Sequence, residues 1–422
     1  MNGTSLRYCE ASLRIRYSTA QNGRPIKKAL VYTRDEHGID ISNVDRDAIR
    51  IVERLKTEGH ETYIVGGAVR DLMVSKKPKD FDIVTSATPT RIKRVFRNSR
   101  IIGRRFRLVH VYFGQKIVEV STFRSLKDGP TSNTYGTIEE DVLRRDFSIN
   151  ALFYDPQEQV VIDYVGGVRD IRAKKVRPII PLGVIFKDDP VRMIRAAKYS
   201  ASTGFSLPFL LRWKIKREGP LLSSVSHSRL TEELFKIINS AHASSIVASL
   251  ENLGLWNHLQ PHASKLMRSD PIYREKYYQS LRELEKAYQE SSEAPSGKLL
   301  SYLLRDYLDT IVDWSREPLE NFRESLSACR SFVIPMNPPR IELENAVRLL
   351  FREHGVAVKK ARTFEKGRNK EAVPEGTPEG KLAEGPLAPI DGGPEGPKRK
   401  KRRRRRRKAS ATQEKGTPVE NK

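Results

Sequence analysis

Apolar residues recur along this chain at two different spacings, and the change between them divides the sequence into regions. Ala48, Ile49, Val52 and Leu55 repeat at helical spacing and the run ends at Gly59, which predicts a helix. Short apolar runs of strand character follow and alternate with helical segments up to about residue 175. The predicted strands lie in residues 62–67, 80–87, 107–113, 116–123 and 159–165, and the predicted helices in residues 67–75, 88–97 and 139–147.

The second half of the chain has a different pattern. From Asp188 to about residue 354 the apolar positions fall at helical spacing in one segment after another. The sequence therefore predicts an α+β fold, in which a head with a mixed sheet precedes an all-helical neck and body. The predicted boundaries are a basic N-terminal lead-in at residues 1–45, the head at 46–175, the neck and body at 176–355, and a tail at 356–422.

Charge points to the kind of partner. Lysine and arginine outnumber aspartate and glutamate by 77 to 52 in 422 residues, a formal net charge of +25. This excess favours a polyanionic partner, nucleic acid before an anionic membrane surface. The tail is poor in large apolar residues and carries eleven consecutive basic residues from Lys398 to Lys408. We expect a disordered arm that binds phosphate groups, although a solvated charge run or a nuclear-localisation signal has the same composition.

Several classes of protein are disfavoured by what the sequence lacks. Cys9 and Cys329 cannot make a disulfide framework, and no CxxC or HExxH spacing indicates zinc. The 38% hydrophobic composition can support a core, but no apolar run approaches the roughly 18 residues that a membrane helix needs. The first residues also lack the apolar stretch of a signal peptide. We therefore expect a cytoplasmic protein without a transmembrane segment.

Three carboxylates are candidates for a metal site. Asp80 and Asp82 stand two apart at the entrance of a predicted strand, so the period of two turns both to the same face. Such crowding is costly unless a cation neutralises it, and hard oxygen ligands favour Mg²⁺. Glu119 interrupts an apolar strand and faces away from its core side, where a third ligand could stand. A surface turn and a solvent-facing glutamate remain the alternatives for these positions.

A glycine turn precedes the carboxylates. Gly66 and Gly67 follow a predicted strand and open a predicted helix, so backbone amides there could hold a triphosphate, with Arg70 as an added cation. The alternative is a tight strand–helix turn with an Arg70–Asp71 surface pair. The pattern is not a GxGxxG dinucleotide motif. A similar segment at residues 165–170 has flanks that do not match, so we do not expect an internal repeat.

Two further clusters have both a binding and a structural interpretation. Arg145 could hold phosphate oxygens and Asp146 the ribose hydroxyls, although an ion pair at a helix end explains both. Asp189 and Arg192 lie three apart at a helix start and share a face, which places an acceptor beside a donor. That pair matches adenine and cytosine and mismatches guanine and uracil. Ordinary helix-start chemistry is the alternative.

Four segments in this order resemble the class II nucleotidyltransferases, namely VGGAVRDL, KDFDIVT, RRDFSINALFY and DDPVRMIRA. That family comprises CCA-adding tRNA enzymes and bacterial poly(A) polymerases, with a polymerase-beta-like head and a helical neck and body. The resemblance covers roughly residues 30–260. Residues 96–111, the segment GTIEEDVLRRDFSIN and the arginine-rich end of the chain look like the bacterial poly(A) polymerase branch.

The resemblance implies roles for residues by position in this sequence. It implies Asp80, Asp82 and Asp146 as active-site acids, Glu119 as a further metal ligand, and Gly66, Gly67, Arg70, Arg145, Asp189, Arg192 and Arg195 as nucleotide contacts. The family commonly has glutamate where Asp188 stands and arginine where Lys198 stands, so the contacts there are expected to differ.

The activity implied is template-independent addition of AMP from ATP to RNA 3′ ends, with two Mg²⁺ ions and release of pyrophosphate. RNA and ATP are the expected partners, and the sequence leaves RNA-decay or RNA-chaperone proteins open. A CCA-adding enzyme is the nearest alternative, because the base-pairing logic fits C as well as A. A catalytically silent RNA-binding protein and a DxD glycosyltransferase are the others, the latter disfavoured by the charge.

Overall fold

The computed structural model describes residues 14–19, 25–103, 107–125, 134–290 and 294–358. The chain divides into two units, Met1–Lys360 and Ala361–Lys422, and every described residue belongs to the first. The predicted disordered tail and its basic run lie outside the described residues, apart from residues 356–358. Within the described ranges, no helix has both the length and the apolar character to cross a membrane.

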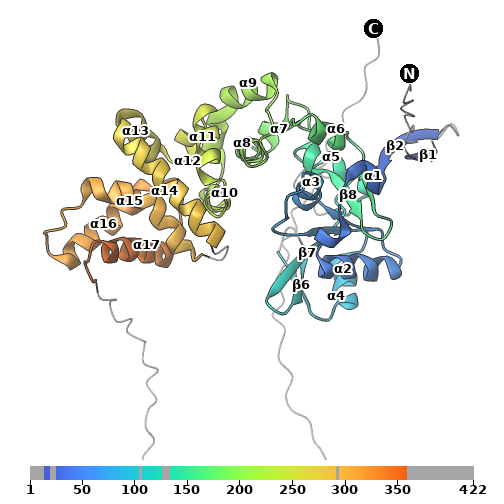
Figure 1. Cartoon of the computed structure of the whole chain (residues 1–422), viewed down its shortest axis with the longest axis horizontal. Coiled ribbons are helices and arrows are strands. Elements are labelled where there is room, and N and C mark those ends of the chain that lie inside the picture. The colour runs from blue at the N-terminus through green and yellow to red at the C-terminus, as the bar shows by residue number, and fades with distance from the viewer. Residues whose placement is uncertain (1–13, 20–24, 104–106, 126–133, 291–293, 359–422) are drawn as a thin grey trace, which may run out of the picture. The chain divides into compact units, whose positions relative to one another are not determined.

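The head is built on one mixed sheet (Figure 1). Its nine strands, all in described residues, are β1 (Arg14–Thr19), β2 (Pro25–Tyr32), β3 (Thr62–Val65), β4 (Asp82–Thr85), β5 (Ser99–Ile102), β6 (Leu108–Phe113), β7 (Lys116–Thr122), β8 (Leu152–Asp155) and β9 (Val160–Asp163). They are ordered β1-β2-β9-β8-β3-β4-β7-β6-β5. The β4–β7 pair is parallel and the other pairs are antiparallel. The predicted mixed sheet is confirmed.

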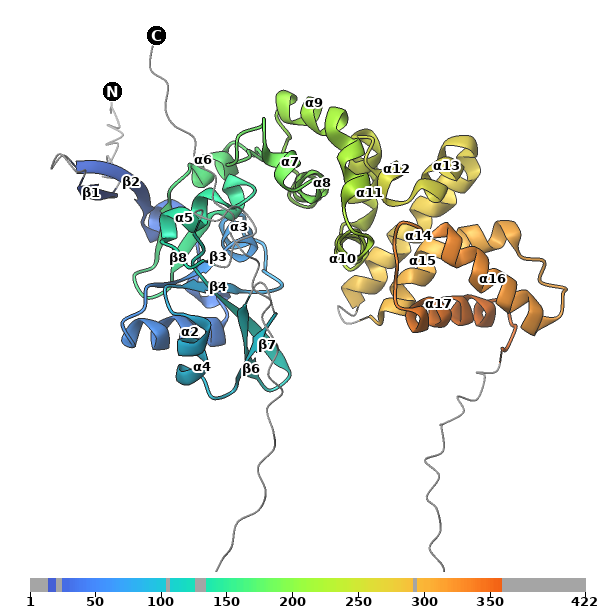
Figure 2. The same ribbon diagram turned by 180° about the vertical axis from the view of Figure 1, so that it is seen from behind.

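Helices cover both faces of this sheet. They are α1 (Arg34–His37), η1 (Ile41–Asn43), α2 (Arg46–Thr57), α3 (Gly67–Met73), α4 (Pro89–Val95), α5 (Ile138–Leu143), η2 (Ser148–Asn150) and α6 (Gly167–Arg172). α2 and α4 lie side by side in both views (Figures 1 and 2). α2 buries Ile51 and Leu55 in the core that also holds Ile83, whereas Val142 of α5 packs on the opposite face with Val84.

The rest of the described chain is helical, as predicted. Its helices are α7 (Ile185–Asp188), α8 (Val191–Thr203), α9 (Phe209–Glu218), η3 (Gly219–Ser224), α10 (His227–Ile238), α11 (Ala243–Asn252), α12 (Trp256–Leu259), α13 (Pro261–Ser269), α14 (Pro271–Glu290), α15 (Ser296–Ile311), α16 (Pro318–Phe332) and α17 (Arg340–Glu353). α8 packs against α11, and α15 packs against α14 and α17. The boundary predicted between residues 175 and 176 falls between α6 and α7 and stays a prediction.

Four strands were not predicted. β1 and β2 form a hairpin within the basic lead-in, and β2 joins it to the rest of the sheet by pairing with β9. β5 and β8, of four residues each, were also missed. Within the described part of the lead-in, β1 and β2 therefore extend the sheet.

The similar segments at residues 65–71 and 165–170 both join a strand to a short helix, but ψ at the glycine differs, −138° at Gly66 and 28° at Gly166. In each, a glycine at positive φ joins a strand to a short helix, Gly66 at 81° and Gly166 at 84°. In the second turn Asp163 accepts from the amides of Val165, Gly166 and Gly167 at 3.1, 2.8 and 2.9 Å. Asp163 also accepts from the Val168 amide at 3.0 Å. A carboxylate of the chain itself therefore fills the anion position of the second turn.

Replacing Asp163 tests this turn. Because the carboxylate is buried and accepts these amides, Asp163→Ala should destabilise the fold by about 2–4 kcal/mol, measured from urea unfolding curves. Asp40→Ala is the control, since Asp40 is exposed and caps η1 through Ser42, and it should cost about 1 kcal/mol or less. Equal small losses in both variants would contradict this account.

Candidate active site

The glycine turn between β3 and α3 carries one acid and one cation beside its backbone. A Cβ on Gly66 would meet Asp82 Oδ2 at 3.7 Å, and one on Gly67 would meet Arg70 Nη2 at 3.4 Å. The positive φ of Gly66 is a conformation that other residues rarely adopt. Because glycine has no side chain, the backbone at Gly66 and Gly67 is left uncovered between Asp82 and Arg70.

Asp82 and Glu119 lie next to each other on neighbouring strands. β4 and β7 run parallel with Ile83 opposite Val120, so Asp82 and Glu119, which precede these two residues, lie at the same level on the two strands. Asp82 shares its face with Val84, and Glu119 faces away from Val118 and Val120. Both acids therefore project from the face of the sheet that α5 covers.

The charge of Asp82 is disfavoured where it stands. Burial raises the pKa of Asp82 to about 6, repulsion by Glu119 and then Asp80 adds to the rise, and Arg145 opposes it. Although the side chain reaches solvent in a cavity, protein atoms surround it on its other sides. A divalent cation would relieve this repulsion, so the carboxylate oxygens fit one. In the part of the chain that the structure describes, however, no three His, Cys, Asp or Glu side chains already form a metal-binding group.

Asp80 and Asp82 line a cavity of about 700 Å³. The head also supplies the glycine turn and two predicted cations to its wall, and the neck supplies a third predicted cation. These predicted residues are Gly66, Gly67, Arg70, Arg145 and Arg195. Further lining residues that were not predicted include Asn150, Tyr199, Glu233, Lys236 and Tyr288.

Both head arginines are held by neighbours at the cavity wall. Arg70 donates to Asp71 Oδ1 at 2.9 Å and to Asn150 Oδ1 at 2.6 Å, so the Arg70–Asp71 pair exists and yet borders the cavity. Arg145 donates to Asp141 Oδ2 at 2.8 Å and to the Asn150 carbonyl at 3.3 Å. Asn150 therefore connects the two guanidinium groups.

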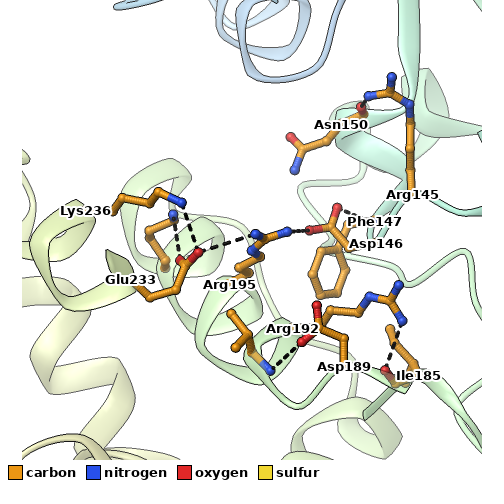
Figure 3. A network of polar contacts seen from close by, with 12 residues as sticks. Arg145, Asp146, Phe147, Asn150, Ile185, Asp189, Arg192, Arg195, Glu233 and Lys236 are labelled. Atoms are coloured by element: carbon orange, nitrogen blue, oxygen red, sulfur yellow. Dashed lines mark hydrogen bonds and ion pairs between the residues drawn. The ribbon is translucent and has the colours of Figure 1, made fainter. Parts of the chain in front are cut away.

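Asp146 has different surroundings from Asp80 and Asp82. Its Oδ1 accepts from the Phe147 amide at 2.8 Å, and its Oδ2 is 3.7 Å from Arg195 Nη1 (Figure 3). Asp146 is not among the residues that line the cavity. The structure thus brings Asp82 and Glu119 together and joins Asp146 to the neck.

The neck gathers three cations around one buried acid. Glu233 of α10 is 3% exposed, and its carboxylate lies 3.3 Å from Arg195, 3.6 Å from Lys198 and 3.1 Å from Lys236 (Figure 3). Burial raises the pKa of Glu233, but the three cations outweigh burial and hold it below its ordinary value. Burial lowers the pKa of Lys198 despite Glu233. This cluster leaves an excess of positive charge at the cavity.

Asp189 and Arg192 are close in sequence but have separate partners. Asp189 Oδ2 accepts from Arg229 Nη2 at 2.9 Å. Arg192 is buried and donates to the Ile185 carbonyl at 3.1 Å (Figure 3). It also lies 3.8 Å from Asp188. Neither Asp189 nor Arg192 lines the cavity that contains Asp82. Their proposed selection of a base stays a prediction.

Sequence reasoning missed the partners that come from distant segments. Asn150 follows Arg145 by five residues, but Glu233 is 38 residues from Arg195 and Arg229 is 40 residues from Asp189. The available signal was helical spacing, because Glu233 and Lys236 are three apart on α10. That spacing predicts that Glu233 and Lys236 share a face of a helix, but it does not predict which residues contact that face.

Comparison with known proteins assigns these segments. Residues 62–177 match the family described as "Poly A polymerase head domain", and residues 204–267 match "Probable RNA and SrmB- binding site of polymerase A". The chain is similar to poly(A) polymerase I of Escherichia coli O6:H1, with 38% identity over 251 residues, 56% of this chain and 54% of that protein. It is also similar to poly(A) polymerase I of Salmonella typhi, with 36% identity over 60% of this chain and 58% of that protein.

CCA-type enzymes are similar as well. A CC-adding tRNA nucleotidyltransferase of Halalkalibacterium halodurans is 35% identical over 51% of this chain and 54% of that protein. The Bacillus stearothermophilus CCA-adding enzyme, solved in complex with CTP, has a TM-score of 0.50 and 26% identity over 73% of this chain and 82% of that one. A CCA-adding enzyme in apo form II has the same fold, with a TM-score of 0.52 and 21% identity over 77% of this chain and 86% of that one.

The chain spans somewhat more than half the length of the poly(A) polymerases that it matches. The matches cover both the head that carries Asp82 and the neck that carries Glu233. The fold, the order of the sequence motifs and these similarities all point to the same group of enzymes. Residues 62–177 and 204–267 therefore match poly(A) polymerase domains, and the chain is similar both to bacterial poly(A) polymerases and to CCA-type tRNA nucleotidyltransferases.

Proposed function

We propose that the protein is a template-independent polynucleotide adenylyltransferase. In this reaction an RNA 3′-hydroxyl attacks the α-phosphorus of ATP in line, the bond to the β-phosphate breaks, and pyrophosphate leaves. The observation that carries the proposal is the position of Asp82, against Gly66 and beside Glu119, in a cavity whose other residues include cations. Poly(A) polymerase I relatives at 36–39% identity support AMP as the group transferred.

The carboxylates have the chemistry to hold two Mg²⁺ ions. Asp80, Asp82 and Glu119 offer hard oxygen ligands, and the raised pKa of Asp82 reflects crowded negative charge that a cation would neutralise. When bound, the ions would lower the pKa of the attacking hydroxyl and stabilise the leaving group.

The other residues bind and orient the reactants. Arg70 and Arg145, fixed by Asp71, Asp141 and Asn150, would contact phosphate oxygens without reorganising. The bare backbone at Gly66 and Gly67 would let the triphosphate approach closely. We propose that Asp146 contacts the ribose while Arg195 holds it in place, since their 3.7 Å contact links the head to the neck.

Base selection is proposed for Asp189 and Arg192. Arg229 would fix the Asp189 carboxylate as an acceptor, and the Ile185 carbonyl would fix the Arg192 guanidinium as a donor. This pattern admits adenine and cytosine and leaves guanine and uracil with unpaired polar groups.

A CCA-adding enzyme is the second candidate. The same donor and acceptor would accept CTP, and the structural relative solved with CTP favours this candidate. Poly(A) addition is preferred because the poly(A) polymerase I relatives are 36–39% identical, against 33–35% for the CCA-type enzymes.

Removing the central carboxylate tests the catalytic proposal. Asp82→Ala should lower AMP transfer to oligo(A) by at least about 10³-fold, because the loss of a metal ligand removes several kcal/mol of transition-state stabilisation. RNA binding, measured without ATP, should stay near wild type. Glu53→Gln is the control, since Glu53 is exposed on α2. Transfer at the wild-type rate in Asp82→Ala would refute the assignment of Asp82 as a metal ligand, whereas no transfer by the wild-type protein would favour a non-catalytic RNA-binding protein.

The raised pKa of Asp82 predicts how cation binding depends on pH. Above about pH 6 the carboxylate is charged, whereas below it a proton must leave before a cation binds. Mn²⁺ affinity, measured by electron paramagnetic resonance of free Mn²⁺, should therefore fall below pH 6 by up to about tenfold per pH unit.

Glu119→Gln provides the matched variant for this measurement. It should bind Mn²⁺ more weakly at neutral pH, with the fall displaced to lower pH, because the first charge that raises the Asp82 pKa is gone. A wild-type affinity that is constant from pH 7 to about pH 4.5 would contradict the assignment of Asp82.

Nucleotide choice separates the two enzymatic candidates. Purified protein should extend oligo(A) with ATP and incorporate CTP poorly, both on that primer and on a tRNA that lacks its terminal CCA. Primer extension resolved on denaturing gels measures all four combinations. Robust incorporation of CTP on the tRNA would instead support the CCA-adding enzyme.

A further inference from the structure

α9 exposes apolar side chains that the active site does not use. Phe209, Leu210 and Trp213 are 70%, 63% and 49% exposed. Leu211 and Ile215 of the same helix are buried and attach it to the core. The exposed apolar residues therefore lie away from the side that holds the helix in place.

The outward side of α9 combines aromatic and basic residues. Positions at i, i+3, i+4, i+7 and i+8 lie on one face of a helix. On α9 these are Phe209, Arg212, Trp213, Lys216 and Arg217, all exposed, and we call them the α9 face. Arg217 lies over the Trp213 ring at 5.1 Å from its centroid, as this spacing requires.

The α9 face carries no acid. The single acidic residue of the helix, Glu218, is largely buried and pairs with Lys214 at 2.7 Å. Three cations thus stand beside two aromatic rings on the face. Adjacent aromatic positions at i and i+4 are about 6 Å apart along the helix axis, so each ring has room for its own base.

We propose that the α9 face binds single-stranded RNA, with Trp213 and Phe209 stacking on bases and Arg212, Lys216 and Arg217 contacting phosphates. Stacking is open to every base because each has a π face, and nearby cations hold the strand. The choice of RNA as the polymer rests on the proposed function. α9 lies within the segment that matches the "Probable RNA and SrmB- binding site of polymerase A", but that match names no surface and does not say which of the two a surface would bind.

Charge favours RNA over a protein partner for this face. A protein that docks on exposed apolar residues needs apolar area, whereas an RNA strand needs π faces together with positive charge. The cation–π contact of Arg217 with Trp213 holds one ring in place before any ligand arrives.

Binding of fluorescein-labelled oligo(A) to the full chain tests stacking, without ATP or divalent cations. Trp213→Ala should weaken binding by about 5-fold or more, and Trp213→Phe should stay within about 2-fold of wild type. Trp213→Leu, which keeps an apolar side chain but no ring, should behave like Trp213→Ala. Wild-type affinity in Trp213→Leu would overturn the proposal and indicate a protein-docking surface.

Tryptophan fluorescence gives an independent measurement. The chain has three tryptophans, of which Trp256 is buried and Trp314 stacks on His354. Oligo(A) should therefore quench the wild-type emission, and Trp213→Phe should lose that quenching while keeping its affinity. Equal quenching in the two proteins would overturn the assignment of Trp213.

Salt dependence tests the cations with a matched control on the same helix. Lys216→Gln should reduce the slope of log K against log salt by about 0.7, because one phosphate contact is lost. Lys214→Gln should leave the slope unchanged, since Lys214 pairs with Glu218. Identical slopes in all three proteins would overturn the proposal. Because these binding assays contain neither ATP nor divalent cations, they separate a failure of this inference from a failure of catalysis.

Discussion

Parallel pairing of β4 with β7 is the constraint on which the candidate site depends. It places Asp82 beside Glu119 on one face of the sheet, and a shift of one residue would turn Glu119 into the opposite core. Two carboxylates held this close repel each other, as the raised pKa of Asp82 indicates. A cation bound next to the glycine turn, where phosphates would lie, would therefore relieve this repulsion.

The neck places positive side chains at the cavity, whereas the head places carboxylates there. Glu233 offsets only part of the positive charge of Arg195, Lys198 and Lys236, and its burial fixes their positions. Because Arg195 also contacts Asp146, one side chain connects this cluster to the head. A site for a polyanion built this way needs both segments, which explains why the cavity draws its lining from residues as far apart as Gly66 and Lys236.

Local periodicity was sufficient for most elements and for the acids on them. The alternation around Glu119 predicted a face away from Val118 and Val120, and the β4–β7 register places that face beside Asp82. The shared face predicted for Asp80 and Asp82 stays a prediction, because Asp80 precedes β4. The β1–β2 pair was missed because it lies in a basic segment with weak periodicity, although β1 pairs with β2 along its whole length with one register shift between Arg16 and Tyr17. The partners of Asp146 and Asp189 could not be predicted, since tertiary packing alone decides which distant helix meets them.

The α9 face is a case in which helical periodicity does not predict which side of a helix is buried. Its residues follow the helical period, but apolar side chains stand on both sides of α9, so the sequence did not indicate which side joins the core. Burial of Leu211 and Ile215 decides it and leaves Trp213 outside. Burying the opposite face would have hidden two rings and also three cations, which is far more costly. The basic residues therefore keep this face of α9 in solvent, and the aromatic rings on the same face are exposed as a result.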